Sequence, residues 1–343
     1  MTIKQDPRFA VLYCAMRPPF QPTVTGQAPW SRQFLMDLFD GEHTSSLRSW
    51  WSRVSIGLLR PRFDIHMFRV LGSDEPEHAI LSHNRPAMID AAKRTWDDIN
   101  PDRYDGVVAL MTPPPTNAAA AGRNAVLDPG GSIPHSQHEV GHMLGLEHVL
   151  DNVGSTHIYG SPYCVMSNQW TFSYNIPTIP SSANLQIPNP LFWNASPAPS
   201  AATMWRAFRG TTLFDNPTKV TRVRRGQSAF VKSWSGGLQT SELAHPVLIV
   251  CEESPGGPAL LVEVRMPTSF DGPRMTRNVV VHSCKTRANP PDKHEVDPVW
   301  FEGALPLRPG ATFGTSDGRW SIVLDRIVES SNEMRNVYRI TVR

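Results

Sequence analysis

The order of apolar and polar residues in the first half of the chain alternates between two patterns. Residues 9–16, 63–70 and 107–111 form short apolar runs, which are typical of strands. Residues 45–55 and 84–99 carry apolar side chains three and four positions apart, the spacing of an amphipathic helix. Strands that alternate with helices predict a mixed α/β layer.

The last 130 residues follow a different pattern, in which short runs of β-forming residues recur between turns. Turns such as Gly236-Gly237 and Asp317-Gly318 separate these runs. Seven or more short strands with turns between them predict an antiparallel β-sandwich. The expected strands cover residues 219–223, 229–234, 247–251, 259–264, 279–282, 320–327 and 337–342.

The two patterns meet near Gly210. An apolar stripe at helical spacing in residues 200–209 predicts one more helix, and Gly210 ends it because glycine readily adopts the conformation found after a helix. The chain has 343 residues, which is enough for two domains. We therefore predict an α+β protein with one domain at residues 1–210 and a second at residues 211–343.

Composition and charge exclude several classes of protein. Apolar residues make up 40% of the chain, too large a share for a disordered protein. Lys and Arg number 33 against 31 Asp and Glu, so no overall basic charge points to a nucleic-acid partner. No apolar run approaches the roughly 18 residues of a membrane-spanning helix, and we expect no membrane span.

The amino terminus and the cysteines leave the cellular compartment open. No apolar core of a secretory signal peptide precedes residue 9. A cytoplasmic protein, export without a leader, and a leader missing from this sequence are all compatible with that observation. Cys14, Cys164, Cys251 and Cys284 are widely spaced, so we expect buried thiols, with a Cys251–Cys284 disulfide as the alternative.

The candidate chemistry lies in an eleven-residue segment that reads His-Glu-Val-Gly-His-Met-Leu-Gly-Leu-Glu-His. His138 and His142 are four positions apart, so a helix projects both side chains from one face toward a shared metal ion. Glu139 can approach a metal-bound water without being a ligand. Gly145 permits the sharp turn that ends the helix and returns His148 as a third ligand. Three nitrogen ligands leave the fourth tetrahedral position open, as in catalytic zinc sites.

This segment fits the pattern H-E-x-x-H-x-x-G-x-x-H and resembles the metzincin clan of zinc endopeptidases. The clan also has a methionine-containing turn after the third histidine, and Met166 in Tyr-Cys-Val-Met-Ser matches it. Asn168 stands where some metzincins carry a tyrosine, so no tyrosine is assigned to the site. Further stretches resemble the immune inhibitor A-like and gametolysin-like branches of the clan, namely residues 47–58, 98–108, 142–151 and 262–313.

The resemblance implies a catalytic domain with a mixed twisted sheet, an active-site helix and a C-terminal helix, followed by the β-sandwich. Its upper subdomain would cover residues 1–148 and its lower subdomain residues 149–210. The three histidines of the motif would hold one catalytic Zn²⁺, and Glu139 would be the general base for hydrolysis of a protein or peptide substrate. The resemblance also favours a secreted protein. Calcium is compatible with it but is indicated by no residue, and we expect a monomer.

Two other functions stay open. The protein could be a zinc hydrolase of a non-peptide substrate, or a catalytically silent binding or adhesion protein in which zinc only supports the fold. Glu139 favours catalysis, because a silent protein has no need of a base. His135 is expected to flank the start of the helix rather than to bind the ion, and the alternative for Met166 is a core methionine that fills a gap.

Overall fold

A computed structural model of the protein forms two compact units that are interleaved along the chain. The first unit comprises residues 1–53, 57–145 and 175–195, and the second comprises residues 54–56, 146–174 and 196–343. The structure describes residues 3–16, 30–43, 46–128, 130–151, 159–169, 171–172, 174–175, 194–234, 245–254, 257–267, 275–284, 298–332 and 335–343. The division into domains at residue 210 stays a prediction.

The first unit combines one sheet with helices. A two-stranded ladder of β7 (Tyr174–Asn175) and β8 (Asn194–Ala195) comes later in the chain. The other elements, with one 3₁₀ turn at Pro101–Arg103, are β1 (Arg8–Ala15), α1 (Arg32–Asp40), α2 (Leu47–Val54), β2 (Arg62–Val70), α3 (His78–Leu81), α4 (Arg85–Thr95), β3 (Gly106–Thr112), β4 (Ala119–Ala121), β5 (Asn124–Leu127) and α5 (Ile133–Met143).

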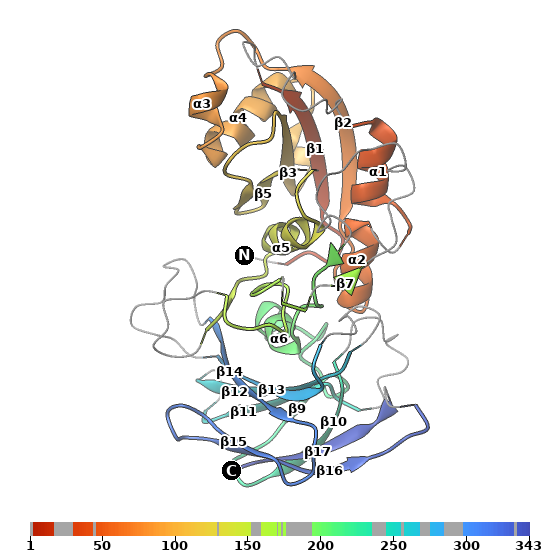
Figure 1. Cartoon of the computed structure of the whole chain (residues 1–343), viewed down its shortest axis with the longest axis vertical. Helices are drawn as coiled ribbons and strands as arrows, with labels where there is room; N and C mark the ends of the chain where they lie inside the picture. The colour runs from red at the N-terminus through yellow and green to blue at the C-terminus, as the bar shows by residue number, and fades with distance from the viewer. Residues whose placement is uncertain are drawn as a thin grey trace. The chain divides into compact units, whose positions relative to one another are not determined.

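The sheet of the first unit has five strands in the order β2-β1-β3-β5-β4. The pairs among β2, β1, β3 and β5 are parallel, whereas β4 runs antiparallel to β5 and lies at the edge. Figure 1 shows α4 and α1 on opposite sides of this sheet. Because successive side chains of a strand point to opposite faces, Ala10 and Leu12 of β1 pack in one cluster with Met88 of α4. On the other face the rings of Phe39 and Phe63 lie 5.3 Å apart.

The second unit is built mainly from strands. It contains β6 (Val149–Leu150), α6 (Ala201–Phe208), β9 (Val220–Arg222), β10 (Ser228–Lys232), β11 (Leu248–Glu252), β12 (Ala259–Arg265), β13 (Asn278–Cys284), β14 (Val299–Pro306), β15 (Thr312–Gly314), β16 (Ser321–Val328) and β17 (Val337–Val342).

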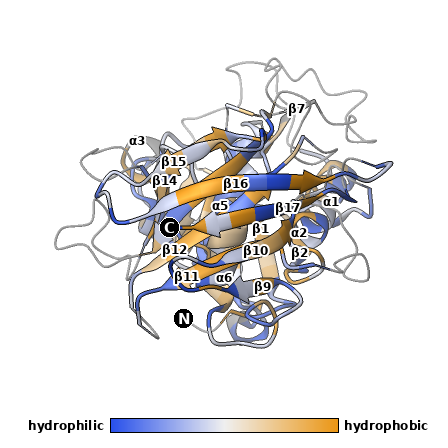
Figure 2. Cartoon of the chain, turned by 90° about the horizontal axis from the view of Figure 1, so that it is seen from below, coloured by the Kyte–Doolittle hydropathy of each residue, from blue (hydrophilic) through white to orange (hydrophobic). Residues whose placement is uncertain are grey.

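These strands form a six-stranded sheet, β6-β14-β13-β12-β11-β9, and a four-stranded sheet, β10-β17-β16-β15. Neighbouring strands are antiparallel except β6 with β14 and β9 with β11. Side chains of both sheets share one buried cluster, to which Val262 and Val281 contribute from one sheet and Ile322 and Ile340 from the other. Figure 2 shows β16 as apolar along most of its length with a short hydrophilic interruption.

A buried group of charged and polar side chains anchors α6 to the six-stranded sheet. Glu263, Arg265 and His282 have no exposed surface. The Arg265 guanidinium donates to the carbonyls of Pro199, at 3.1 Å, and Ala198, at 3.3 Å. Ser200 caps α6, and the backbone N–H of the next residue, Ala201, donates to the Glu263 carboxylate at 2.9 Å. Burial of the Glu263 and Arg265 charges is favourable only with such hydrogen-bond partners.

The mixed helices and sheets, several of them antiparallel, agree with the predicted α+β class. All four cysteines are free and buried, so the expectation of buried thiols is confirmed and the alternative Cys251–Cys284 disulfide is absent. Burial raises the pKa of Cys14 to about 12. Among the described residues, no helix combines the length and the apolar character that crossing a membrane requires.

Candidate metal centre

The helix that carries the motif, α5, has a defined start and end. Ser132 caps it, and the Ser132 hydroxyl accepts a hydrogen bond from the His135 N–H at 3.3 Å. This confirms that His135 flanks the helix start. At the other end the Gly145 N–H donates to the His142 carbonyl at 2.9 Å, and Gly145 adopts a φ of +91°. Glycine takes up such a φ without the steric penalty of a side chain, which confirms the predicted stop.

Three histidines converge at this helix end. One ligand nitrogen from each of His138, His142 and His148 lies within 4.8 Å of the other two. The Nε2 atoms of His138 and His142 are 3.1 Å apart, and their rings are nearly perpendicular at 81°. Two nitrogens that each lie about 2.0–2.1 Å from a tetrahedral zinc ion are about 3.3 Å apart. The helical pair therefore fits the spacing that a shared ion requires.

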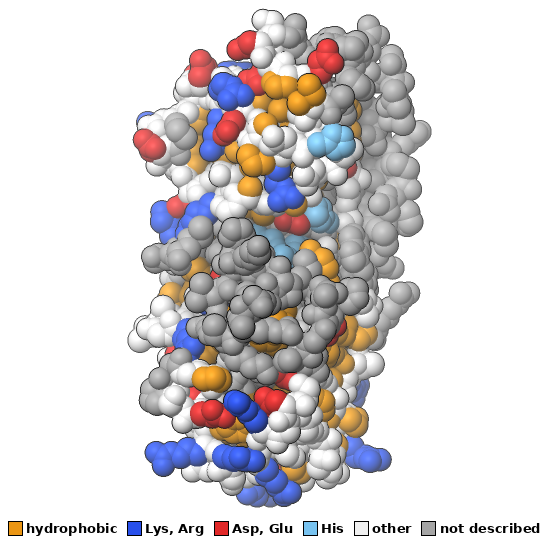
Figure 3. Space-filling view, turned by 90° about the vertical axis from the view of Figure 1, so that its left-hand side faces the viewer, with side chains coloured by type: hydrophobic (Ala, Val, Ile, Leu, Met, Phe, Trp, Pro, Cys, Tyr) orange, Lys and Arg blue, Asp and Glu red, His pale blue; other side chains and the backbone are white. Residues whose placement is uncertain are grey.

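The three imidazoles differ in exposure. His138 is buried at 2% exposed surface, whereas His142 and His148 are partly exposed. Histidine side chains reach the surface on the face of the molecule drawn in Figure 3. A site that is buried on one side and open on the other can hold an ion and still admit a small molecule to it.

His148 is followed at once by a strand of the second unit. β6 pairs in parallel with β14, Val149 opposite Val299 and Leu150 opposite Trp300. The ring of Tyr159 meets that of His148 edge-on, with centroids 5.4 Å apart. Sequence reasoning missed the strand, because two residues carry no periodic signal, and it also missed Tyr159, which no motif marks.

Met166 lies in a tight turn that is tied to the same strand. The Met166 carbonyl accepts a hydrogen bond from the Val149 N–H at 2.8 Å, and the Met166 side chain is fully buried. Within the turn the Ser167 N–H donates to the Cys164 carbonyl at 3.0 Å, and the Ser167 hydroxyl accepts from the Ser161 N–H at 2.9 Å. The methionine turn thus supports the backbone directly after the third histidine, while the role assigned to Met166 stays a prediction.

Glu139 is buried and held by the edge strand β4. One carboxylate oxygen accepts a hydrogen bond from the Ala120 N–H at 2.6 Å, and the other lies 3.4 Å from His135 Nδ1. His135 Nε2 is in turn 2.9 Å from the Ala118 carbonyl. Side chains on one face of α5 therefore fix the position of β4. The motif places Glu139 beside the first histidine, but it does not reveal this contact with the sheet.

The described site brings together the three predicted ligands and places Glu139 on the helix that carries two of them. Imidazole nitrogens are typical ligands of zinc and of several other transition metals, so this donor set fits a metal ion without naming the element. Scans against models of protein families and against curated proteins found no match.

Proposed function

We propose that the protein is a zinc-dependent endopeptidase of the metzincin type. The convergence of His138, His142 and His148 within 4.8 Å carries the proposal, because three imidazoles from one short segment form the ligand set of an open, catalytic zinc site. In this proposal residues 1–210 form a metzincin-like catalytic domain and residues 211–343 form a β-sandwich domain.

The three histidines would hold the ion, and Glu139 would move the protons. A bound zinc ion supplies Lewis acidity and brings the pKa of a coordinated water toward about 7. Glu139 would accept a proton from the attacking water and deliver it to the leaving amine. Its burial and its position one residue after His138 support this role.

The proposed base lies beside the edge strand β4. Among the described strands β4 pairs only with β5, and the outward backbone groups of its central residue are already bound, the Ala120 N–H by Glu139 and the Ala120 carbonyl by Arg85. The hydrogen bond from the Ala120 N–H holds the Glu139 carboxylate in this position.

The test is metal content together with proteolysis, for the wild type and for Glu139→Gln. Because glutamine keeps the shape of glutamate but cannot accept the proton, we expect about one zinc per chain in both proteins and casein cleavage by the wild type alone. Glu147→Gln is the matched control, since Glu147 lies in the same segment but pairs with Arg206 at 3.3 Å. Equal casein turnover by wild type and Glu139→Gln would refute the proposal. Zinc binding with no turnover of peptides by the wild type would favour the silent binding protein.

A further inference from the structure

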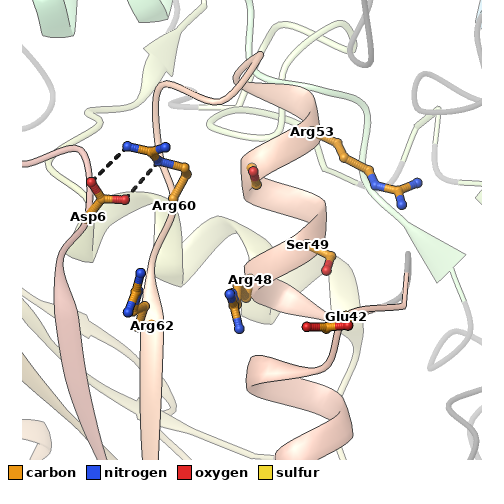
Figure 4. A pocket seen from close by; sticks show the side chains of 8 residues that line it. Asp6, Glu42, Arg48, Ser49, Arg53, Arg60 and Arg62 are labelled. Atoms are coloured by element: carbon orange, nitrogen blue, oxygen red, sulfur yellow. Dashed lines mark hydrogen bonds and ion pairs between the residues drawn. The ribbon is translucent and has the colours of Figure 1, made fainter. Parts of the chain in front are cut away.

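An arginine-rich pocket lies in the first unit between the start of β2 and the helix α2 (Figure 4). Its volume is about 370 Å³. Four arginines and two carboxylates are among its lining residues, which gives the lining a formal charge of +2. The lining residues are Asp6, Glu42, Arg48, Ser49, Ser52, Arg53, Arg60 and Arg62.

The acidic partners of Arg60 and Arg48 leave guanidinium donors of both side chains unused. Asp6 accepts from Arg60 Nε at 2.8 Å and from Arg60 Nη2 at 2.9 Å, which leaves the Nη1 donors of Arg60. Arg48 uses Nη1 toward the Asp40 carboxylate at 3.3 Å, which leaves its Nε and Nη2 donors. Both ion pairs are substantially exposed, so each holds its arginine only weakly.

Arg62 adds a third charge, which acts electrostatically on the Asp40 carboxylate without forming an ion pair with it. Its side chain is exposed, and it takes part in none of the ion pairs there. Figure 4 shows Arg62 on β2 and Arg48 on α2 on opposite walls of the pocket, with Arg60 above them. Like charges that face each other across a pocket repel, and an anion between them removes the repulsion.

We propose that this pocket binds a phosphate or sulfate group through Arg48, Arg60 and Arg62. A guanidinium presents a planar fork of donors that matches two oxygens of such a group, and three forks from different directions suit a tetrahedral anion. This site uses none of the residues of the metal centre and does not rest on the proposed peptidase function.

The test is calorimetric titration of the full-length, zinc-loaded protein with inorganic phosphate and, separately, with inorganic sulfate. Loss of charge-assisted hydrogen bonds should make binding to Arg62→Ala about tenfold weaker or more. Arg62→Lys keeps the positive charge but loses the planar pair of donors, so its affinity should lie between that of the wild type and that of Arg62→Ala. Melting temperatures should be unchanged, because Arg62 is exposed. Arg335→Ala, an exposed arginine of the second unit, is the matched control and should bind like the wild type.

Saturable binding of either ion that depends on Arg62 supports the site. Affinity for phosphate that rises from pH 6 to 8, while affinity for sulfate stays constant, supports a dianion, because only phosphate gains charge in that range. Absence of saturable binding, or an equal loss in Arg335→Ala, would overturn the proposal. Anion binding that disappears when zinc is removed would also overturn it, because the anion would then lie at the histidines.

Discussion

Replacing His282 with leucine should flatten the pH dependence of the protein's stability below about pH 6.5. His282 is fully buried on β13, with Nδ1 3.6 Å from the Glu263 carboxylate and the Arg265 guanidinium nearby. Burial, and to a smaller extent the charge of Arg265, lower the pKa of His282 from 6.5 to about 3. The folded protein therefore keeps this imidazole neutral, whereas the unfolded chain protonates it below pH 6.5.

The sign and size of the effect follow from this difference. A depressed histidine pKa contributes stability that is present above the unfolded pKa and is lost as the pH falls toward the folded pKa of about 3. The loss approaches about 1.4 kcal/mol per pH unit, and it amounts to about 2 kcal/mol between pH 7 and pH 5. Leucine has a similar volume and binds no proton, so the His282→Leu variant should lack this part of the loss.

Urea unfolding followed by tryptophan fluorescence from pH 5 to 7 measures the effect. Both proteins should be metal-free, because metal binding by histidine ligands depends on pH and would add to the measured change. The free energy of unfolding of wild type minus that of the variant should fall by about 2 kcal/mol from pH 7 to pH 5. Parallel curves for the two proteins would show that His282 is protonated in the folded state and refute the reasoning.

Two further predictions concern the metal centre. Met166→Ala should lower the free energy of unfolding by about 2–5 kcal/mol, because the side chain is fully buried, whereas Met166→Leu should cost less than about 1.5 kcal/mol. Equal urea midpoints for the two variants would contradict that packing. Removal of the metal should lower the melting temperature and added zinc should restore it, since an ion at a hundred times its Kd stabilises by about 2.7 kcal/mol. A scanning calorimeter that records no shift would argue against a metal at the histidines.

Local pattern predicted much of the fold because its signals lie close together in sequence. The helix α4 and the strands β1 and β3 were expected from periodicity alone and are confirmed. The helix α1 was missed although Ser31 caps it and Phe34, Leu35 and Leu38 fall on one buried side. The strands β4 and β5 were also missed, because both are short and β4 consists of three alanines, which favour helices over strands.

The candidate site is likewise predictable from the sequence only in part. The three histidines lie within one short segment, from His138 to His148, so their convergence could be predicted from their spacing in the sequence. The contact of Glu139 with Ala120 could not, because it joins a helix to an edge strand that no pattern marked. The pairing of β6 with β14 could not be predicted either, since two residues without a periodic signal meet a strand about 150 positions away.

That pairing has a consequence for the order of events during synthesis. The amino terminus of a chain leaves the ribosome first, so β6 cannot pair with β14 until residues 299 and 300 have emerged. The imidazole directly before β6 gains its final support only then, after most of the polypeptide has been made. A metal centre assembled in this order would be completed only after about 300 of the 343 residues have been made.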